Sequence, residues 1–353
     1  MKRIMAMADR AALLSLKGLV ALNLLFLLSF LVILLLAGRA GAETVCSGKD
    51  MTAALQKDDP ATYGKIEAEA AATLNGEGLL WKLERPGERP SWLFGTMHLT
   101  DPRVVTLPAA AQKAFDASGT VVIETTEVLD QAKMMAALAK EPELMMFTDG
   151  TTLASLLSSK DAALVDKGLA ARGISMAAVA KMKPWMLSAM VALPACEMVR
   201  KAEGAPVLDV KLAQEAKTQG KDLEGVESVA DQLHAMASLP ISLHMKGLVE
   251  TLKLGDKADD LSETMVVLYQ RGRIGMIWPL LRAVVPDEAG GPDGYAAFEE
   301  ALVISRNKVM AERALPILKK GDVFMAVGAL HLPGPQGLVE QFRKAGYVVT
   351  RAD

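Results

Sequence analysis

The sequence predicts an α+β (mixed α/β) domain in which a central β-sheet is covered by helices. Strand signals are few and short, long helical stretches separate them, and they gather towards both ends of the chain that follows the N-terminal apolar segment. Sheets with this pattern bury their faces against helices. We therefore expect the helical middle of the chain to be an insertion or cap on one domain, residues 43–353, and not an independent domain.

The first 42 residues have the pattern of an export signal. Four basic residues precede an uncharged apolar run at 18–38, and the small tripeptide Ala40–Ala42 follows. A basic N-terminal region, an apolar core and small residues at a cleavage site are typical of a secretory signal. The apolar run also approaches the length of roughly 20 residues that a helix needs to span a bilayer. Two alternatives stay open, cleavage after Ala42 or a retained membrane anchor. Both predict an extracytoplasmic domain. This domain would contact the membrane only through the N-terminal segment, and only if that segment is not cleaved.

The charge and cysteine content narrow the classes of partner. Residues 43–353 carry 34 basic and 41 acidic residues, so their net charge is −7. This acidic balance gives no electrostatic attraction to nucleic acid or to anionic lipid. The chain has two cysteines, Cys46 and Cys196, and we expect a disulfide between them in an oxidising compartment, in preference to a catalytic thiol.

Periodicity and turn residues place the elements in order. The expected helices and strands are a helical lead-in at 47–75, a hairpin of strands at 79–83 and 91–95, a helix at 108–118, a strand at 120–124, a Met-rich helical stretch over the next hundred residues, short strands at 206–209 and 221–224, helices over 228–270, an amphipathic helix at 295–320, a strand at 322–328, a helix at 337–344 and a closing strand at 347–350. The methionines are interpreted as flexible core packing.

Two of the four histidines occupy matching motifs. GTMHLTDP begins at Gly95 and contains His98, and GALHLPGP begins at Gly328 and contains His331, so both fit G-x-x-H-L-x-x-P. Each follows an apolar strand, and ligands collect beyond the ends of such strands. The glycines allow close backbone approach. We expect the two histidines to meet at one edge of the sheet and to share an ion or a substrate.

Carboxylates and an arginine are candidates to complete this site. Glu124 ends the strand VVIE, and Glu224 ends a similar short strand. Two imidazoles with one or two carboxylates suit Zn²⁺, Mn²⁺, Co²⁺ or Fe²⁺. Arg306 on the amphipathic helix is a candidate to stabilise an oxyanion or hold a substrate carboxylate. The structural alternatives are a helix-capping Glu124 and a salt-bridged Arg306. No G-x-S-x-G, H-E-x-x-H or G-x-G-x-x-G motif is present, which disfavours serine-hydrolase, zincin and dinucleotide sites.

Several segments of the sequence resemble the TraB/GumN family. The resemblance rests on WLFGTMHLTDPRV, VVIET, KPW at Lys183–Trp185, the pair Arg306-Asn307, AVGALHLPGPQGL and AGYVV, in this order. The family is related to the membrane-tethered TIKI metalloproteases and resembles erythromycin esterase and a ChaN-type haem-binding lipoprotein. The resemblance implies a sheet flanked by helices and metal-dependent hydrolysis, without indicating a substrate.

The resemblance also implies roles for particular residues. The motif histidines fall on His98 and His331, the acidic residue on Glu124, and the arginine on Arg306 with Asn307 beside it. Glu224 is only a partial match, because its stretch reads LEGVE with Gln232 further on.

Together these observations predict an exported, peptidase-like hydrolase that uses Mn²⁺, Co²⁺ or Zn²⁺. His98, His331 and Glu124 are expected to hold the metal, Glu124 alternatively to act as general base, and Arg306 to stabilise negative charge. The expected partner is a peptide or small-molecule substrate. The alternative is a non-catalytic extracytoplasmic module that binds haem, metal or a small ligand through the same histidines. The sequence does not indicate the oligomeric state.

Overall fold

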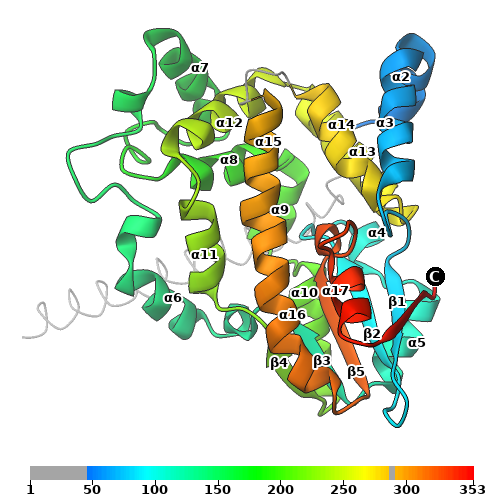
Figure 1. The fold of residues 1–353 in the computed structure, drawn as a ribbon. Helices are drawn as coiled ribbons and strands as arrows, with labels where there is room; N and C mark the ends of the chain where they lie inside the picture. The colour runs from blue at the N-terminus through cyan, green and yellow to red at the C-terminus, as the bar shows by residue number, and fades with distance from the viewer. Residues whose placement is uncertain (1–45, 286–290) are drawn as a thin grey trace, which may run out of the picture. The chain divides into compact units, whose positions relative to one another are not determined.

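The computed structural model describes residues 46–285 and 291–353 (Figure 1). The predicted signal or anchor at residues 1–42 lies outside these residues. Within the described part of the chain, no helix combines the length and apolar character needed to cross a membrane.

A six-stranded mixed sheet forms the centre of the domain, which confirms the predicted fold class. The strands are β1 (Leu80–Glu84), β2 (Ser91–Thr96), β3 (Thr120–Ile123), β4 (Asp222–Gly225), β5 (Val323–Gly328) and β6 (Val348–Arg351). Their order is β4-β3-β5-β2-β1-β6. The four strands from β4 to β2 are parallel, whereas β1 pairs antiparallel with β2 and β6. The parallel strands therefore end at one common edge.

Helices surround this sheet and make up most of the remaining chain. They are α2 (Thr52–Asp58), α3 (Pro60–Ala72), α4 (Pro102–Val105), α5 (Ala109–Ala117), α6 (Gln131–Lys140), α7 (Ser159–Ala170), α8 (Pro184–Ala192), α9 (Ala195–Ala202), α10 (Leu208–Thr218), α11 (Val229–Ala237), α12 (Ile241–Lys253), α13 (Lys257–Gln270), α14 (Ile277–Val284), α15 (Gly291–Glu299), α16 (Ser305–Leu318) and α17 (Leu338–Lys344). Short 3₁₀ turns lie at Thr126–Leu129, Pro142–Leu144, Ala154–Leu156, Ile274–Met276 and Ala329–His331.

Side-chain alternation along the strands divides the core into two layers. On one face, Phe94 and Phe324 pack against Phe115 of α5, and the helices α3, α10, α13 and α14 extend this layer. On the other face, Met325 and Val327 pack against α16 and α17, which Figure 1 shows in front of the sheet. Because both faces of β5 are covered, its strand is buried on both sides, as its unbroken apolar sequence predicts.

The mid-chain helices have a smaller core of their own. Leu169 of α7, Leu187 of α8 and Leu248 of α12 are fully buried against one another. This layer is separate from the two layers on the sheet. The Met-rich segment therefore forms a helical lobe beside the sheet (Figure 1).

Two predicted elements differ from the structure. The predicted strand at 206–209 is the entry to α10: Val207 has extended backbone angles as the N-cap residue, and Leu208 already begins the helix. The predicted continuous helix at 295–320 begins at Gly291 and is interrupted by a π-helical segment, Glu300–Ile304. Such segments are often found at functional sites, and this one ends two residues before Arg306.

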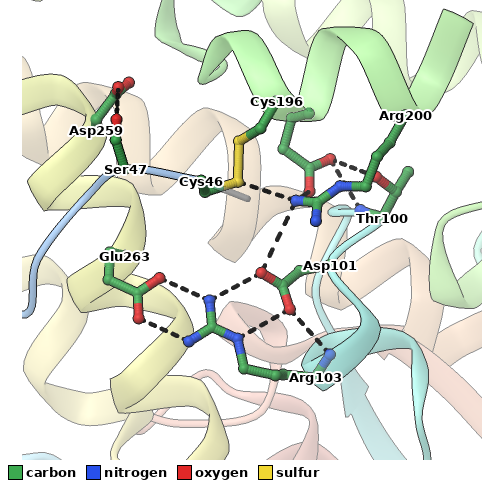
Figure 2. Close-up of a disulfide and its surroundings, with 10 residues drawn as sticks. Cys46, Ser47, Thr100, Asp101, Arg103, Cys196, Arg200, Asp259 and Glu263 are labelled. Carbon is green, nitrogen blue, oxygen red and sulfur yellow. Dashed lines mark hydrogen bonds and ion pairs between the residues drawn. A yellow bond between two sulfur atoms is a disulfide. The ribbon is translucent and has the colours of Figure 1, made fainter. Parts of the chain in front are cut away.

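A disulfide joins Cys46 to Cys196, as predicted (Figure 2). Cys196 lies on α9, which also carries Glu197 and Arg200. Arg200 donates to the Cys46 sulfur at 3.0 Å and to Glu197 Oε1 at 2.8 Å. The bond therefore fixes the start of the described chain against α9.

The same helix holds the loop that follows β2. Glu197 Oε2 accepts hydrogen bonds from the backbone N–H and hydroxyl of Thr100, at 2.9 and 2.8 Å. Next to it, Arg103 forms paired hydrogen bonds with both Asp101 and Glu263 (Figure 2). Burial opposes ionisation of Asp101, but Arg103 outweighs it and lowers the pKa of this carboxyl. The loop that contains His98 is thus anchored to α9 and α13.

Replacing both cysteines by serine should lower the free energy of unfolding by about 4–5 kcal/mol, because the bond closes a loop of 150 residues in the unfolded chain. Urea unfolding monitored by circular dichroism measures this loss. The wild-type protein under reducing conditions is the matched control. A loss below about 1 kcal/mol in both would contradict a stabilising role for the bond.

Candidate functional site

Three neighbouring parallel strands bring the predicted residues to one edge of the sheet. Glu124 directly follows β3, His331 ends the turn after β5, and His98 lies two residues beyond β2. In the sheet, β5 lies between β3 and β2. The carboxyl ends of such strands are the usual place for ligand sites in α/β sheets.

Glu124 lies at the centre of this group. Its Oε1 accepts a hydrogen bond from the Gly328 N–H at 2.8 Å, and the Nε2 atoms of His98 and His331 each lie 3.9 Å from the same oxygen. Its Oε2 accepts from Gln232 at 2.9 Å and from Arg306 at 2.8 Å. Burial opposes the charge of Glu124, but these donors and the nearby positive charges lower its pKa to about 2. Glu124 is therefore a carboxylate at neutral pH.

His331 is buried and is held by α16. Its Nδ1 lies 2.7 Å from Asn307 Oδ1, and the Asn307 Nδ2 donates to the carbonyl of Gln336 at 3.0 Å. An amide oxygen accepts, so Nδ1 carries the proton and Nε2 has the free lone pair towards Glu124. Burial lowers the pKa of His331 to about 4, which keeps the ring neutral.

His98 has a different environment. Its side chain is 58% exposed, and its Nδ1 lies 3.0 Å from Asp209 Oδ2 on α10. The other oxygen of Asp209 accepts from the Thr96 hydroxyl at 2.8 Å. The charge of Asp209 raises the pKa of His98 above its usual value. The carboxylate also fixes the proton on Nδ1, so a neutral His98 presents Nε2 towards Glu124.

Arg306 is largely committed to two carboxylates. It donates to Glu227 through Nε at 2.9 Å and Nη2 at 2.6 Å, to Glu124 through Nη2, and to the Leu302 carbonyl through Nη1 at 3.1 Å. These contacts engage four of the five N–H donors of a guanidinium group. Although burial opposes its charge, Glu227 and Glu124 raise the pKa of Arg306. Its geometry suits positioning of Glu124, with one N–H on Nη1 left for a bound group.

A cavity of about 270 Å³ lies against these residues. It is lined by Thr96, Met97, His98, Met265, Tyr269, Ile277, Trp278, Leu302, Val303, Arg306, Gly328, Ala329, Leu330 and His331. Tyr269 is buried and donates its hydroxyl to the Gly95 carbonyl at 2.9 Å. Most of the remaining lining, including Met97, Met265 and Ile277, is apolar. We call this space the inner cavity.

The two motif glycines make different contacts. A Cβ on Gly328 would lie 3.2 Å from Glu124 Oε1, 3.4 Å from His331 Cδ2 and 3.6 Å from His98 Nε2. It would occupy the space that these three groups surround. A Cβ on Gly95 would instead meet Ala329 at 2.9 Å, so Gly95 allows β2 to approach the turn after β5.

Other predicted residues lie elsewhere. Glu224 is exposed on the edge strand β4, and the structure does not bring it to the site. Glu227, three residues later, is buried and holds Arg306. Edge strand β4 ends at Gly225, and only beyond it does the chain turn inwards to Glu227 and Gln232.

Sequence reasoning missed Asp209 as a functional residue. The segment before it has an extended, β-like pattern, which hid its place in the first turn of α10. Glu227 and Gln232 were visible only as parts of an imperfect motif. None of the three carries a local signal that connects it to a histidine or an arginine far away in the sequence.

The donor set fits a divalent metal in chemical type. Two imidazole Nε2 atoms face one carboxylate oxygen, and each ring has a hydrogen-bond acceptor at Nδ1, the arrangement that orients histidine ligands. No three His, Cys, Asp or Glu side chains in the described residues are grouped tightly enough to form a closed site as they stand. The two 3.9 Å separations nevertheless remain below the roughly 4.2 Å that two ligands at about 2.1 Å from one ion can span.

Comparison with known families assigns the chain to a family. The model of the TraB/PrgY/gumN family matches residues 79–351, which include all three strands of the site. The chain belongs to the TraB/PrgY/gumN family.

The curated relatives include metalloproteases. Metalloprotease TIKI2 of Danio rerio is 26% identical over 319 residues, which cover 76% of this chain and 60% of the relative. Metalloprotease TIKI1 of Danio rerio is 26% identical over 76% of this chain and 62% of the relative. Metalloprotease TIKI1 of Homo sapiens is 26% identical over 77% of this chain and 61% of the relative. The chain thus spans about 60% of the length of these relatives.

Replacing Asp209 by Asn should lower the pKa of His98, because the neighbouring negative charge is lost. In the metal-free protein, a raised folded-state pKa contributes stability that is fully present below about pH 6.5 and is lost as pH rises through the folded pKa. The stability difference between wild type and Asp209→Asn should therefore be largest at acidic pH. NMR titration of His98 and urea unfolding at several pH values measure both effects. Asp166→Asn, the same change at an exposed position on α7, is the control. An unchanged His98 titration in Asp209→Asn would contradict the assignment.

Gly328→Ala should weaken divalent-metal binding about tenfold or more, since the new methyl group occupies the space between Glu124 and the two histidines. Isothermal titration with Mn²⁺, Co²⁺ or Zn²⁺ measures the change. Gly150→Ala is the matched control, because a Cβ there meets nothing within 4 Å. Equal affinities in the two variants would show that this space is not a metal site.

Proposed function

We propose that this protein is an exported, metal-dependent hydrolase that acts on peptide bonds. The observation that carries the proposal is the approach of His98 Nε2 and His331 Nε2 to the same oxygen of Glu124, each at 3.9 Å. The similarity to TIKI metalloproteases supports a hydrolytic role. The disulfide supports folding in an oxidising, extracytoplasmic compartment.

His98, His331 and Glu124 would hold the ion, and Mn²⁺, Co²⁺ and Zn²⁺ all suit mixed imidazole and carboxylate donors. When bound, such an ion supplies an activated water and polarises a carbonyl group. Asp209 and Asn307 fix the tautomers of the two histidines. His98, protonated in the metal-free protein, would have to lose its Nε2 proton to serve as a ligand.

The ionisation of Glu124 favours a ligand role over that of general base. A carboxylate with a pKa of about 2 has little affinity for a proton at neutral pH, whereas an efficient general base has a pKa near the working pH. Arg306 and Gln232 hold its Oε2 and leave Oε1 directed to the histidines. Arg306 thereby positions Glu124, and its remaining N–H is available to an oxygen of the substrate.

The cavity walls would orient the scissile amide. Hydrolysis adds the hydroxyl of water to the acyl carbon, breaks the C–N bond and delivers a proton to the leaving amine. Met97, Met265 and Ile277 supply an apolar lining that limits water around this bond.

Metal content provides the direct test of this proposal. Protein purified without chelator or nickel resin should contain nearly one divalent ion per chain, and the variant His98→Ala/His331→Ala should lose both the ion and peptide hydrolysis. Elemental mass spectrometry and a peptide-library assay measure the two properties. His234→Ala is the control, because His234 is exposed and pairs with Glu141 away from the site.

Each result leads to a distinct conclusion. Metal that is retained in the double variant, or hydrolysis that is unaffected by it, would overturn the proposal. Metal binding by the wild type without hydrolysis of any peptide would instead favour the binding-module alternative. A haem titration of wild type and His331→Ala would then follow.

A further inference from the structure

A second cavity of about 520 Å³ adjoins the inner cavity. The two share Trp278 of α14, Val303 of the π-helical segment and Leu330 of the turn after β5 as lining residues. We call the second one the outer cavity. It is lined beyond these three by the end of α3, by α14, by Glu299 and Ile304, and by the chain at 333–337.

The inner cavity is small for a polypeptide substrate. Sites for small organic ligands usually measure about 300–1,000 Å³, and the inner cavity, at about 270 Å³, lies below this range. It accommodates the groups around a scissile bond. A longer polypeptide bound at the site would therefore have to continue outside the inner cavity. The outer cavity offers such a path, because it adjoins the inner cavity at Trp278, Val303 and Leu330.

The outer wall is linked to the metal-binding candidate His331. Asn307 lines the outer cavity, accepts from His331 Nδ1 and donates to the Gln336 carbonyl in the same wall. The Gly334 N–H donates to the Leu74 carbonyl at 2.7 Å, which ties α3 to this loop. These contacts give the outer cavity a defined position relative to the site.

The lining also has a definite chemical character. Leu74 is 53% exposed and, with Trp278 and Leu330, gives the outer cavity apolar lining. Glu69 is neutralised by Arg282 in an ion pair at 2.5 Å. The cavity therefore offers apolar surface and one carboxylate, that of Glu299, which has no ion pair among the described residues.

We infer that the outer cavity binds the residues of an extended polypeptide on one side of the scissile bond. It would take an apolar side chain against Leu74 and Trp278 and a basic side chain near Glu299. This inference rests on the proposed function, because it assigns the substrate of that same site. It makes Leu74 and Glu299 specificity-determining residues that lie outside the metal centre.

The test uses Leu74→Ser and Glu299→Lys in the full chain. The probes are ten-residue alanine-based peptides with one Leu and one Lys at varied positions, and a blocked tripeptide that fills only the inner cavity. For the preferred long peptide, each variant should lower kcat/KM about tenfold, whereas the tripeptide rate should stay within about twofold. Glu299→Lys should also favour peptides in which Glu replaces Lys.

Matched variants separate this effect from a general loss of stability. Leu156→Ser removes another exposed leucine on the helical lobe, and Glu300→Lys reverses the charge of the residue next to Glu299. Both should cleave the long peptides as the wild type does. Parallel losses for long and short substrates in Leu74→Ser, or no loss for either, would overturn the inference.

The failure of the proposed function gives a different result. If the wild type hydrolyses no peptide with Mn²⁺, Co²⁺ or Zn²⁺, the hydrolase proposal fails, and fluorescence anisotropy with the labelled long peptide still tests the outer cavity. Binding that is weakened about tenfold by Leu74→Ser and Glu299→Lys would support a polypeptide groove. Absence of binding, or equal binding by all variants, would overturn it.

Discussion

Glu124 is a buried carboxylate whose charge must be compensated from three elements at once. Its two oxygens accept hydrogen bonds from the N–H of Gly328 at the end of β5, from Gln232 of α11 and from Arg306 of α16. A buried charge without such partners costs several kcal/mol. The ends of β3 and β5 and the two helices are therefore held in one arrangement, and this arrangement also brings both motif histidines towards the same oxygen.

The two histidines differ because their partners differ. Asn307 is a neutral acceptor, so burial dominates and His331 stays uncharged, whereas the carboxylate of Asp209 favours a charged, exposed His98. The neutral ring of His331 can donate a lone pair as it stands, whereas His98 must first lose a proton. Metal binding at this site would be coupled to pH through His98 in particular.

The mid-chain region contributes directly to the site as well as to the helical lobe. Asp209 and Gln232 come from helices within it, and Glu197 on α9 anchors the His98 loop beside the disulfide. Residues of α14 and of the π-helical segment line both the inner and the outer cavity. The sheet edge thus supplies the ligand candidates, while the helices orient them and line the two cavities.

The sequence by itself determined the mixed α/β class, the hairpin, the buried strand before Gly328 and the matching histidine motifs, because apolar periodicity and glycine turns are local signals. It also indicated Cys46 and Cys196 as a pair. Only the tertiary structure decided that Glu227, and not Glu224, holds Arg306, that Asp209 begins a helix and orients His98, and that most donors of Arg306 are already engaged. These choices depend on contacts between residues about 80 to 180 positions apart. Packing, burial and charge compensation in the folded chain select such contacts, and no local pattern encodes them.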